Sequence, residues 1–434
     1  MLKTVQGRAI CAFALIAFSS LTTGLTQSQD QEPDQRKFIQ VTAKDKYERT
    51  ELATLGLSIE AVRSDSVWGF ATPQVIAELK SKNQFKVLGV FPMSVSRGGH
   101  QSLFDFPSGD EKFHNYRETN AKLRLMTSLN ADISRIHKIG NSLEGLDILA
   151  IQINTNPQAL MTGKSNKPGV IFMGTHHARE HVSTEIPLMM AEFILKNRDD
   201  PKIAALIDNR DIWFIPMVNP DGVEWDISST SYKYWRKNRR KNSNGTYGVD
   251  LNRNYGYKWG TGGSSKDPGD DTYMGEAPFS EPETQNIKKF VEDHLNAKIL
   301  LSFHTYSELI LYPWGGTYDP IANTKDLAVF EKMAKTMAGW NKYKPQQSSD
   351  LYIASGDTTD WAYGEHGIFA FTFELSPSQF GGGGFYPGAS VIDKVFQDNI
   401  KPCLYMIELA DDPYKSLDTH LSKGLKFLTA PGIN

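Results

Sequence analysis

The sequence predicts an α/β fold, with a mixed, mostly parallel central sheet flanked by helices and preceded by a small α+β pro-segment. Two observations predict this fold. From about Phe113 onward, short apolar runs alternate with amphipathic helical patterns, and such runs are typical of strands that are covered on both faces. Residues 37–90 instead combine short strand and helix patterns, and a stretch rich in Gly, Ser and Pro at 94–110 separates them from the rest of the chain.

The first residues carry the pattern of a secretory signal peptide, which we place at residues 1–26. Lys3 and Arg8 precede an apolar run at 9–18 that is too short for a permanent membrane anchor, and small and polar residues follow it. A buried N-terminal helix is the alternative. We therefore expect a secreted or periplasmic protein without a membrane segment once the signal is removed. Cys403 would then be the single cysteine, and its apolar helical surroundings favour a buried thiol.

The next segment, residues 32–108, has the organisation of a pro-segment. Residues 38–41, 68–71 and 85–90 are predicted strands, and 47–55 and 73–80 are predicted helices. A small α+β module between a signal peptide and a large domain is typical of a segment that is later removed. A permanent N-terminal domain is the alternative.

We assign residues 109–412 to a single catalytic domain and residues 413–434 to a C-terminal tail without a clear role. The predicted strands of the domain are 146–153, 170–175, 212–218, 299–303 and 368–373. Amphipathic helices are predicted at 186–197 and 281–295. Ser280 and Glu283 have the spacing of a capping box at the start of the second helix.

Polar residues follow three of these strands, at the edge where α/β sheets bind ligands. His177 and Glu180 come after the strand at 170–175, His304 ends the strand at 299–303, and Glu374 lies at the end of the strand at 368–373. Two histidines and one carboxylate form a catalytic zinc site that leaves a fourth position for water. Such a metal lowers the pKa of its water towards about 7, and a general base must then take the proton.

In this order, these motifs resemble the zinc metallocarboxypeptidases of the pancreatic A/B type, and most closely bacterial carboxypeptidase T. His177 and Glu180 match the His-x-x-Glu motif, and His304 matches the third ligand. Further matches lie at 216–222, 234–237, 249–255 and 351–356, and the likeness runs from about 113 to 409. The resemblance implies one Zn²⁺ ion per chain and hydrolysis of the C-terminal peptide bond of peptides and proteins.

The resemblance also implies the role of each site residue. Glu374 would be the general base, and Arg236 would stabilise the oxyanion. The residues implied to hold the terminal carboxylate of the substrate are Asn252, Arg253 and Tyr352, since a guanidinium matches a carboxylate in bidentate geometry. Arg179 would line the upstream subsite.

The positions that match the specificity pocket of this family are Leu311, Gly315, Ala354, Asp357 and Thr359. B-type enzymes have an acid at the position of Thr359, whereas A-type enzymes are apolar there, so this chain departs from both. Asp357 nearby could receive a basic side chain. We predict broad specificity, with apolar and aromatic terminal residues accepted and Lys or Arg tolerated.

The net charge of −3 argues against a nucleic-acid partner, and we expect a monomer. Two alternatives to the carboxypeptidase interpretation remain. Residues 177–181 also spell H-x-x-E-H, the inverzincin pattern, in which His177 and His181 would bind zinc and Glu180 would be the base. That pattern requires a helix, whereas here it directly follows a predicted strand. The second alternative is a carboxypeptidase-like binding domain without activity, which would be expected to lack a ligand or the base.

Overall fold

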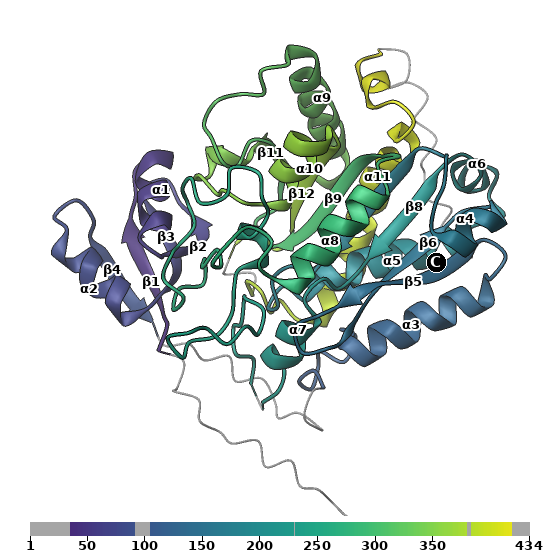
Figure 1. Ribbon diagram of the computed structural model, residues 1–434. Helices are drawn as coiled ribbons and strands as arrows, with labels where there is room; N and C mark the ends of the chain where they lie inside the picture. The colour runs from purple at the N-terminus through teal and green to yellow at the C-terminus, as the bar shows by residue number, and fades with distance from the viewer. Residues whose placement is uncertain (1–34, 92–104, 230, 380–382, 419–434) are drawn as a thin grey trace, which may run out of the picture. The chain divides into compact units, whose positions relative to one another are not determined.

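The computed structural model describes residues 35–91, 105–229, 231–379 and 383–418 (Figure 1). The predicted signal peptide, residues 94–104 of the predicted boundary and the tail from residue 419 lie outside these ranges. In the described residues, no helix is both long and apolar enough to span a membrane. From Arg36 onward, the chain packs as one compact unit.

An eight-stranded sheet with the order β11-β10-β12-β9-β7-β8-β6-β5 forms the centre of the large domain. Its strands are β5 (Ser134–Asn141), β6 (Asp147–Ile153), β7 (Gly169–Gly174), β8 (Asp211–Ile215), β9 (Ala297–Thr305), β10 (Leu309–Tyr312), β11 (Lys344–Gln347) and β12 (Phe369–Leu375). The four middle strands β8, β7, β9 and β12 run parallel, and β6 and β10 join them antiparallel. This arrangement confirms the predicted mixed sheet.

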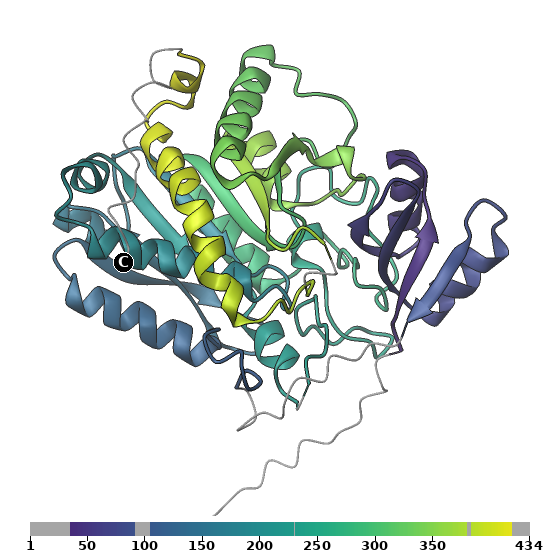
Figure 2. The ribbon, with the colours of Figure 1, turned by 180° about the vertical axis from the view of Figure 1, so that it is seen from behind.

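Helices cover both faces of this sheet because successive side chains of its buried strands point to opposite faces. On β7, Val170 and Phe172 belong to one hydrophobic core, whereas Ile171 and Met173 belong to another. α5 and α11 cover the first face, which is nearer the viewer in Figure 2, and α8 and α10 cover the second (Figures 1 and 2). The helices of the domain are α3 (Tyr116–Leu129), α4 (Pro157–Thr162), α5 (Val182–Lys196), α6 (Pro201–Asn209), α7 (Pro220–Asp226), α8 (Pro282–Asp293), α9 (Thr324–Asn341), α10 (Thr358–His366) and α11 (Ile392–Leu409).

The predicted capping box of the helix at 281–295 is wrong. The helix is α8, its N-cap is Glu281, and in the described residues no side chain caps it. Ser280 instead donates its hydroxyl to the Glu281 carboxylate at 2.8 Å, and the Glu283 carboxylate accepts the backbone N–H of Leu143 at 2.9 Å. Both side chains are therefore used in contacts that lie outside the first turn.

The segment that precedes the large domain forms its own antiparallel sheet, with the order β2-β3-β1-β4. We call residues 37–91 the N-terminal module. Its elements are β1 (Lys37–Thr42), α1 (Lys46–Thr54), β2 (Ser58–Val62), β3 (Ser66–Ala71), α2 (Pro73–Ser81) and β4 (Val87–Phe91). They confirm the strands and helices predicted for this segment and add β2. The two helices pack on a separate small core that includes Ile39, Leu52 and Val67.

Candidate functional site

The parallel strands bring the three polar clusters of the sequence to one edge of the sheet. β7 ends at Gly174, and the loop after it carries His177 and Glu180 before α5 begins. His304 lies near the end of the neighbouring strand β9 and is paired in register with Glu374 on β12. The shared edge therefore places two histidines and two carboxylates together, as expected for the carboxyl ends of parallel strands.

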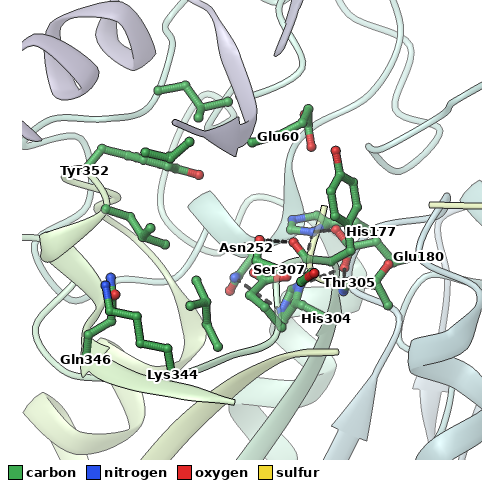
Figure 3. Close-up of a pocket in the computed structure, with 18 of the residues that line it drawn as sticks. Glu60, His177, Glu180, Asn252, His304, Thr305, Ser307, Lys344, Gln346 and Tyr352 are labelled. Carbon is green, nitrogen blue, oxygen red and sulfur yellow. Dashed lines mark hydrogen bonds and ion pairs between the residues drawn. The ribbon is translucent and has the colours of Figure 1, made fainter. Parts of the chain in front are cut away.

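His177, Glu180 and His304 form a buried cluster with the geometry of a metal site (Figure 3). His177 Nδ1 lies 2.8 Å from Glu180 Oε1, His304 Nδ1 lies 2.9 Å from Glu180 Oε2, and the two Nδ1 atoms are 3.1 Å apart. Zinc binds nitrogen and oxygen at about 2.0–2.2 Å, so two ligands of one ion are at most about 4.4 Å apart. The cluster meets this limit and has the donor types that zinc takes.

Asp250 orients His177 in this cluster, a role that was not predicted from the sequence. His177 Nε2 lies 3.0 Å from Asp250 Oδ1. Because a carboxylate only accepts, His177 donates its Nε2–H to Asp250, and with a metal bound in the cluster Nδ1 would supply its lone pair to the ion. Burial alone would raise the pKa of Asp250, but the charges of Arg236 and His177 hold it well below its usual value. The sequence did contain an indication of this role, because Asp250 lies inside the family-like motif at 249–255.

The neighbouring histidines bind other groups. His181 Nε2 lies 2.9 Å from Asp226 Oδ2, and His176 Nε2 lies 2.9 Å from the hydroxyl of Tyr255. α5 begins only at Val182, so residues 177–181 are not helical. The inverzincin alternative requires His177 and His181 on one helix, and this geometry contradicts it.

A cavity of about 270 Å³ opens onto the cluster. Besides the three cluster residues, its lining includes all the residues predicted for catalysis and for binding a terminal carboxylate, namely Arg236, Asn252, Arg253, Tyr352 and Glu374. Burial, followed by the charge of Glu180, raises the pKa of Glu374 well above its usual value. A carboxyl group in this setting takes up a proton readily, which is the property required of a general base near neutral pH.

Arg236 and Arg253 carry positive charge into this cavity. Arg236 Nε donates to Asp250 Oδ2 at 2.9 Å, and this carboxylate raises the pKa of Arg236 although burial opposes it. Arg253 NH1 donates to the carbonyl of Asn252 at 2.8 Å, and Arg253 is only 4% exposed. The Asn252 side chain is held in turn by the backbone N–H of Thr358 at 3.0 Å. Both guanidinium groups are therefore fixed before any substrate arrives.

Of the predicted specificity residues, Ala354 is half-buried and the others are buried, namely Leu311, Gly315, Asp357 and Thr359. None of them is among the described residues that line the cavity. Asp357 caps α10, where its Oδ1 accepts the backbone N–H and the hydroxyl of Thr359. Within the described residues, Asp357 Oδ2 is buried without a hydrogen-bond partner. A Cβ atom at Gly315 would lie 3.0 Å from this oxygen. Burial raises the pKa of Asp357, and burial together with the charge of Asp357 raises that of Asp360.

The N-terminal module enters this site through an irregularity in its edge strand β2. Ile59 pairs with Gly69 and Ala61 with Trp68, which leaves Glu60 as the extra residue of a β-bulge. A bulge redirects a side chain that a regular strand would point elsewhere. Glu60 lies in the wall of the cavity (Figure 3).

Glu60 belongs to a buried chain of alternating charges, which we call the charge quartet. Glu60 Oε1 lies 2.5 Å from Arg179 NH2, Arg179 NH1 lies 2.9 Å from Asp271 Oδ2, and Asp271 Oδ1 lies 2.5 Å from Arg36 NH1. All four side chains are at most 7% exposed. Glu60 and Arg36 come from the start of the chain, so the predicted upstream-subsite residue Arg179 is covered by a carboxylate from the module.

Comparisons with known proteins agree with this geometry. The family model described as zinc carboxypeptidase matches residues 119–401. The chain is 34% identical over 399 residues to a zinc carboxypeptidase of Saccharothrix mutabilis subsp. capreolus, a match that covers 87% of this chain and 90% of the relative. It is 32% identical over 274 residues to carboxypeptidase B of Astacus astacus, which covers 61% of this chain and 86% of the relative. The crystal structure of carboxypeptidase A from Helicoverpa armigera has the same fold, with a TM-score of 0.68 and 23% identity over 89% of this chain and 99% of that one.

Proposed function

Because this chain belongs to the zinc carboxypeptidase family and is therefore a metallocarboxypeptidase, we propose that it is a secreted precursor whose processed form removes single residues from the C-termini of peptides and proteins. One observation carries the proposal: the buried cluster of His177, Glu180 and His304 shares one cavity with Arg253 and Glu374. These are the groups that peptide hydrolysis at a free carboxylate requires. The resemblance stated from the sequence is confirmed at the level of the family.

In this proposal His177, Glu180 and His304 hold one zinc ion, which when bound polarises the scissile carbonyl and lowers the pKa of water. Glu374 receives the proton of the attacking water and then delivers it to the leaving amine. Arg236 donates hydrogen bonds to the oxyanion that develops on the carbonyl oxygen. Because its Nε is already held by Asp250, this donor needs little reorganisation during the reaction.

Arg253, Asn252 and Tyr352 make the proposed enzyme an exopeptidase. A buried guanidinium gains most from a ligand that carries a negative charge in a matching planar geometry. A terminal carboxylate meets that condition, whereas an internal peptide bond does not. Burial raises the pKa of the Tyr352 hydroxyl, and the charge of Arg253 nearby opposes this shift only in part.

We further propose broad specificity for the terminal residue. Thr359 is neutral and its hydroxyl donates to Asp357, so its position lacks the acid of the B-type enzymes and does not select against apolar and aromatic side chains. The unpaired Oδ2 of Asp357 can accept a Lys or Arg side chain. The chain matches a carboxypeptidase B at 32% identity and shares its fold with a carboxypeptidase A, so the comparisons leave both substrate types open.

We assign residues 32–108 to a pro-segment that keeps the precursor inactive. The contacts of β2 support this assignment, because residues 59–63 form part of the cavity wall above the metal cluster. The charge quartet anchors the same strand. A substrate must displace Glu60 from Arg179 before it can use the upstream subsite.

The decisive experiment compares the purified precursor with the form cleaved between residues 92 and 108, using blocked dipeptides with C-terminal Phe, Leu or Arg. We expect activity only after cleavage, one zinc per chain, and loss of activity with a chelator that added zinc reverses. Zinc-dependent activity that is unchanged by cleavage would support a permanent N-terminal domain. The complete absence of hydrolysis in both forms would support an inactive binding domain.

A further inference from the structure

A buried carboxylate outside the cavity, Asp226, is not used by the proposed reaction. Asp226 is the last residue of α7 (Figure 1) and is 0% exposed. Its Oδ1 accepts the backbone N–H of Trp235 at 2.8 Å, and its Oδ2 accepts from His181 Nε2 at 2.9 Å. The hydroxyl of Tyr386 lies 3.1 and 3.0 Å from the two oxygens. Burying a carboxylate is costly unless such donors surround it.

Tyr386 extends this network to a second backbone group. Its hydroxyl donates to Asp226 and accepts the backbone N–H of Tyr234 at 3.1 Å. Burial raises the pKa of Tyr386 well above its usual value, so the hydroxyl keeps the proton that it donates. Asp226 thus holds Trp235 directly and Tyr234 through Tyr386.

These two residues immediately precede Arg236, and their backbone needs to be held. Tyr234 has a φ of 54°, in the left-handed region that is unfavourable for a residue with a bulky side chain. The backbone of Arg236 itself contacts the metal-binding loop, since its carbonyl accepts the N–H of Ala178 at 3.0 Å. His181 connects Asp226 to the other end of the same loop. The direction of the Arg236 side chain therefore depends on the backbone that Asp226 and Tyr386 fix.

We infer that Asp226 and Tyr386 are positioning residues for Arg236, an inference that rests on the proposed role of Arg236 in stabilising the oxyanion. They do not touch the substrate. They hold the backbone of Tyr234 and Trp235 so that the guanidinium reaches both Asp250 and the cavity. Loosening this backbone reduces the fraction of molecules in which Arg236 is aligned with the developing charge.

Tyr386→Phe tests this inference, because it removes the hydroxyl and leaves a ring that can still stack on Tyr232 at a centroid distance of 3.9 Å. We expect kcat of the processed enzyme to fall about tenfold, below the roughly 10²–10³-fold loss on removing an oxyanion donor itself. KM and zinc content should stay within about twofold. The matched control is Tyr232→Phe, since the hydroxyl of this stacked neighbour donates to Asp110 instead, and its kcat should be unchanged.

A double-mutant comparison separates this inference from the proposed function. In an Arg236→Lys enzyme, Tyr386→Phe should lower kcat by less than about twofold further, because its effect acts through Arg236. A full tenfold loss in that background, or no loss in the Tyr386→Phe single variant, would overturn the inference. Arg236→Lys with undiminished kcat would instead refute the proposed role of Arg236. Asp226→Asn, checked for folding by its thermal midpoint, should reproduce the kcat loss of Tyr386→Phe.

Discussion

At the scale of single residues, Asp250 lies outside the metal cluster and holds one of its members, His177. Asp250 accepts hydrogen bonds from His177, from Arg236 and from the backbone of Asn252. One carboxylate therefore holds a proposed metal ligand, the proposed oxyanion donor and the start of the segment proposed to bind the terminal carboxylate. Removal of the Asp250 carboxylate would therefore affect all three of these groups.

We predict that Asp250→Ala lowers the affinity for zinc by about 10–100-fold, the usual cost of losing the partner that orients a histidine ligand. The reason is that His177 would no longer be held in the tautomer that presents Nδ1. Competition for zinc against a chelating dye measures the effect. As a control, Asp293→Ala changes a carboxylate on the surface of α8, which contacts Lys289, and should bind zinc normally. Unchanged affinity in Asp250→Ala would contradict the assigned role.

The pKa of Asp357 leads to a prediction about pH. Burial raises this pKa, so on acidification Asp357 becomes neutral at a higher pH than an ordinary aspartate. A neutral side chain no longer attracts Lys or Arg, so the ratio of kcat/KM for C-terminal Arg over C-terminal Leu should fall as the pH decreases. Asp357→Asn should have a low ratio that does not depend on pH. A wild-type ratio that stays constant over the acidic range would argue against Asp357 as the acceptor.

The sequence predicted most of the site because its residues lie in short motifs, whose residue types indicated the metal cluster and whose resemblance to the family implied the other roles. The edge of the sheet brings His177, Glu180, His304 and Glu374 together, as the order of the strands implied. Arg253 instead lies on the 3-10 helix Leu251–Arg253, and only the family resemblance implied its place in the site. The positioning carboxylates were not predicted. Their partners come from distant parts of the chain, and a buried aspartate in the sequence looks the same as an exposed one.

At the scale of secondary-structure elements, the bulge of β2 places Glu60 of the N-terminal module in the wall of the cavity. The composition of β2 also explains why the sequence did not predict this strand. Continuous apolar runs predicted β7, β9 and β12, whereas β2 and the outer strands β5, β10 and β11 are short or have polar side chains on one face. Glu60 interrupts the pattern of β2, and the interruption is the bulge itself.

We predict that Glu60→Gln raises the residual hydrolytic activity of the uncleaved precursor by at least about tenfold. Removing one charge of a buried pair leaves its partner uncompensated, which typically costs about 3–5 kcal/mol. A hydrolysis assay of the uncleaved precursor measures this residual activity. Glu78→Gln, at an exposed position of α2, is the matched control and should stay inactive. If the Glu60→Gln precursor has no more activity than the unmodified precursor, the charge quartet does not hold the module in place.

Gly56 provides a second test of the contact between the module and the large domain. Its φ is 101°, and a Cβ atom there would lie 2.2 Å from Asp270 Oδ2. Gly56→Ala should therefore both strain the backbone and push the module away from Asp270, so that the uncleaved precursor becomes active. Gly109 has a similar φ of 93°, and a Cβ atom there would have no neighbour within 4 Å among the described residues. Gly109→Ala is therefore the control that has the backbone strain without the clash. Equal activity in the two precursors would contradict the role of the Asp270 contact.

At the scale of the whole molecule, we expect the same contact to make the proposed precursor sensitive to pH. Burial raises the pKa of Asp270 to about 7, and Gly56 of the module covers its carboxylate. Asp267 and Asp271 also raise this pKa, whereas Ser265 and Lys237 lower it. The covered carboxyl binds a proton more tightly than an exposed one, so the closed precursor is favoured at low pH and loses stability as the pH rises towards 7.

We therefore predict that the activity of uncleaved precursor, divided by that of the cleaved enzyme, increases between about pH 4 and 7. The division removes the pH dependence of catalysis itself. Asp270→Asn cannot ionise and should give a ratio that is flat over this range. A rising ratio in Asp270→Asn would assign the effect to another group.

For the proposed pro-segment, the bulge of β2 also provides a single step by which inhibition can be lost or gained in evolution. Deletion of the Glu60 codon alone would let Ile59 and Ala61 continue a regular ladder with Gly69 and Trp68, and would remove the carboxylate from Arg179. The core of the module rests mainly on β1, β3 and the two helices, so this deletion would spare it. A lineage could therefore turn an inhibitory module into a purely structural one, or the reverse, by a change of one codon.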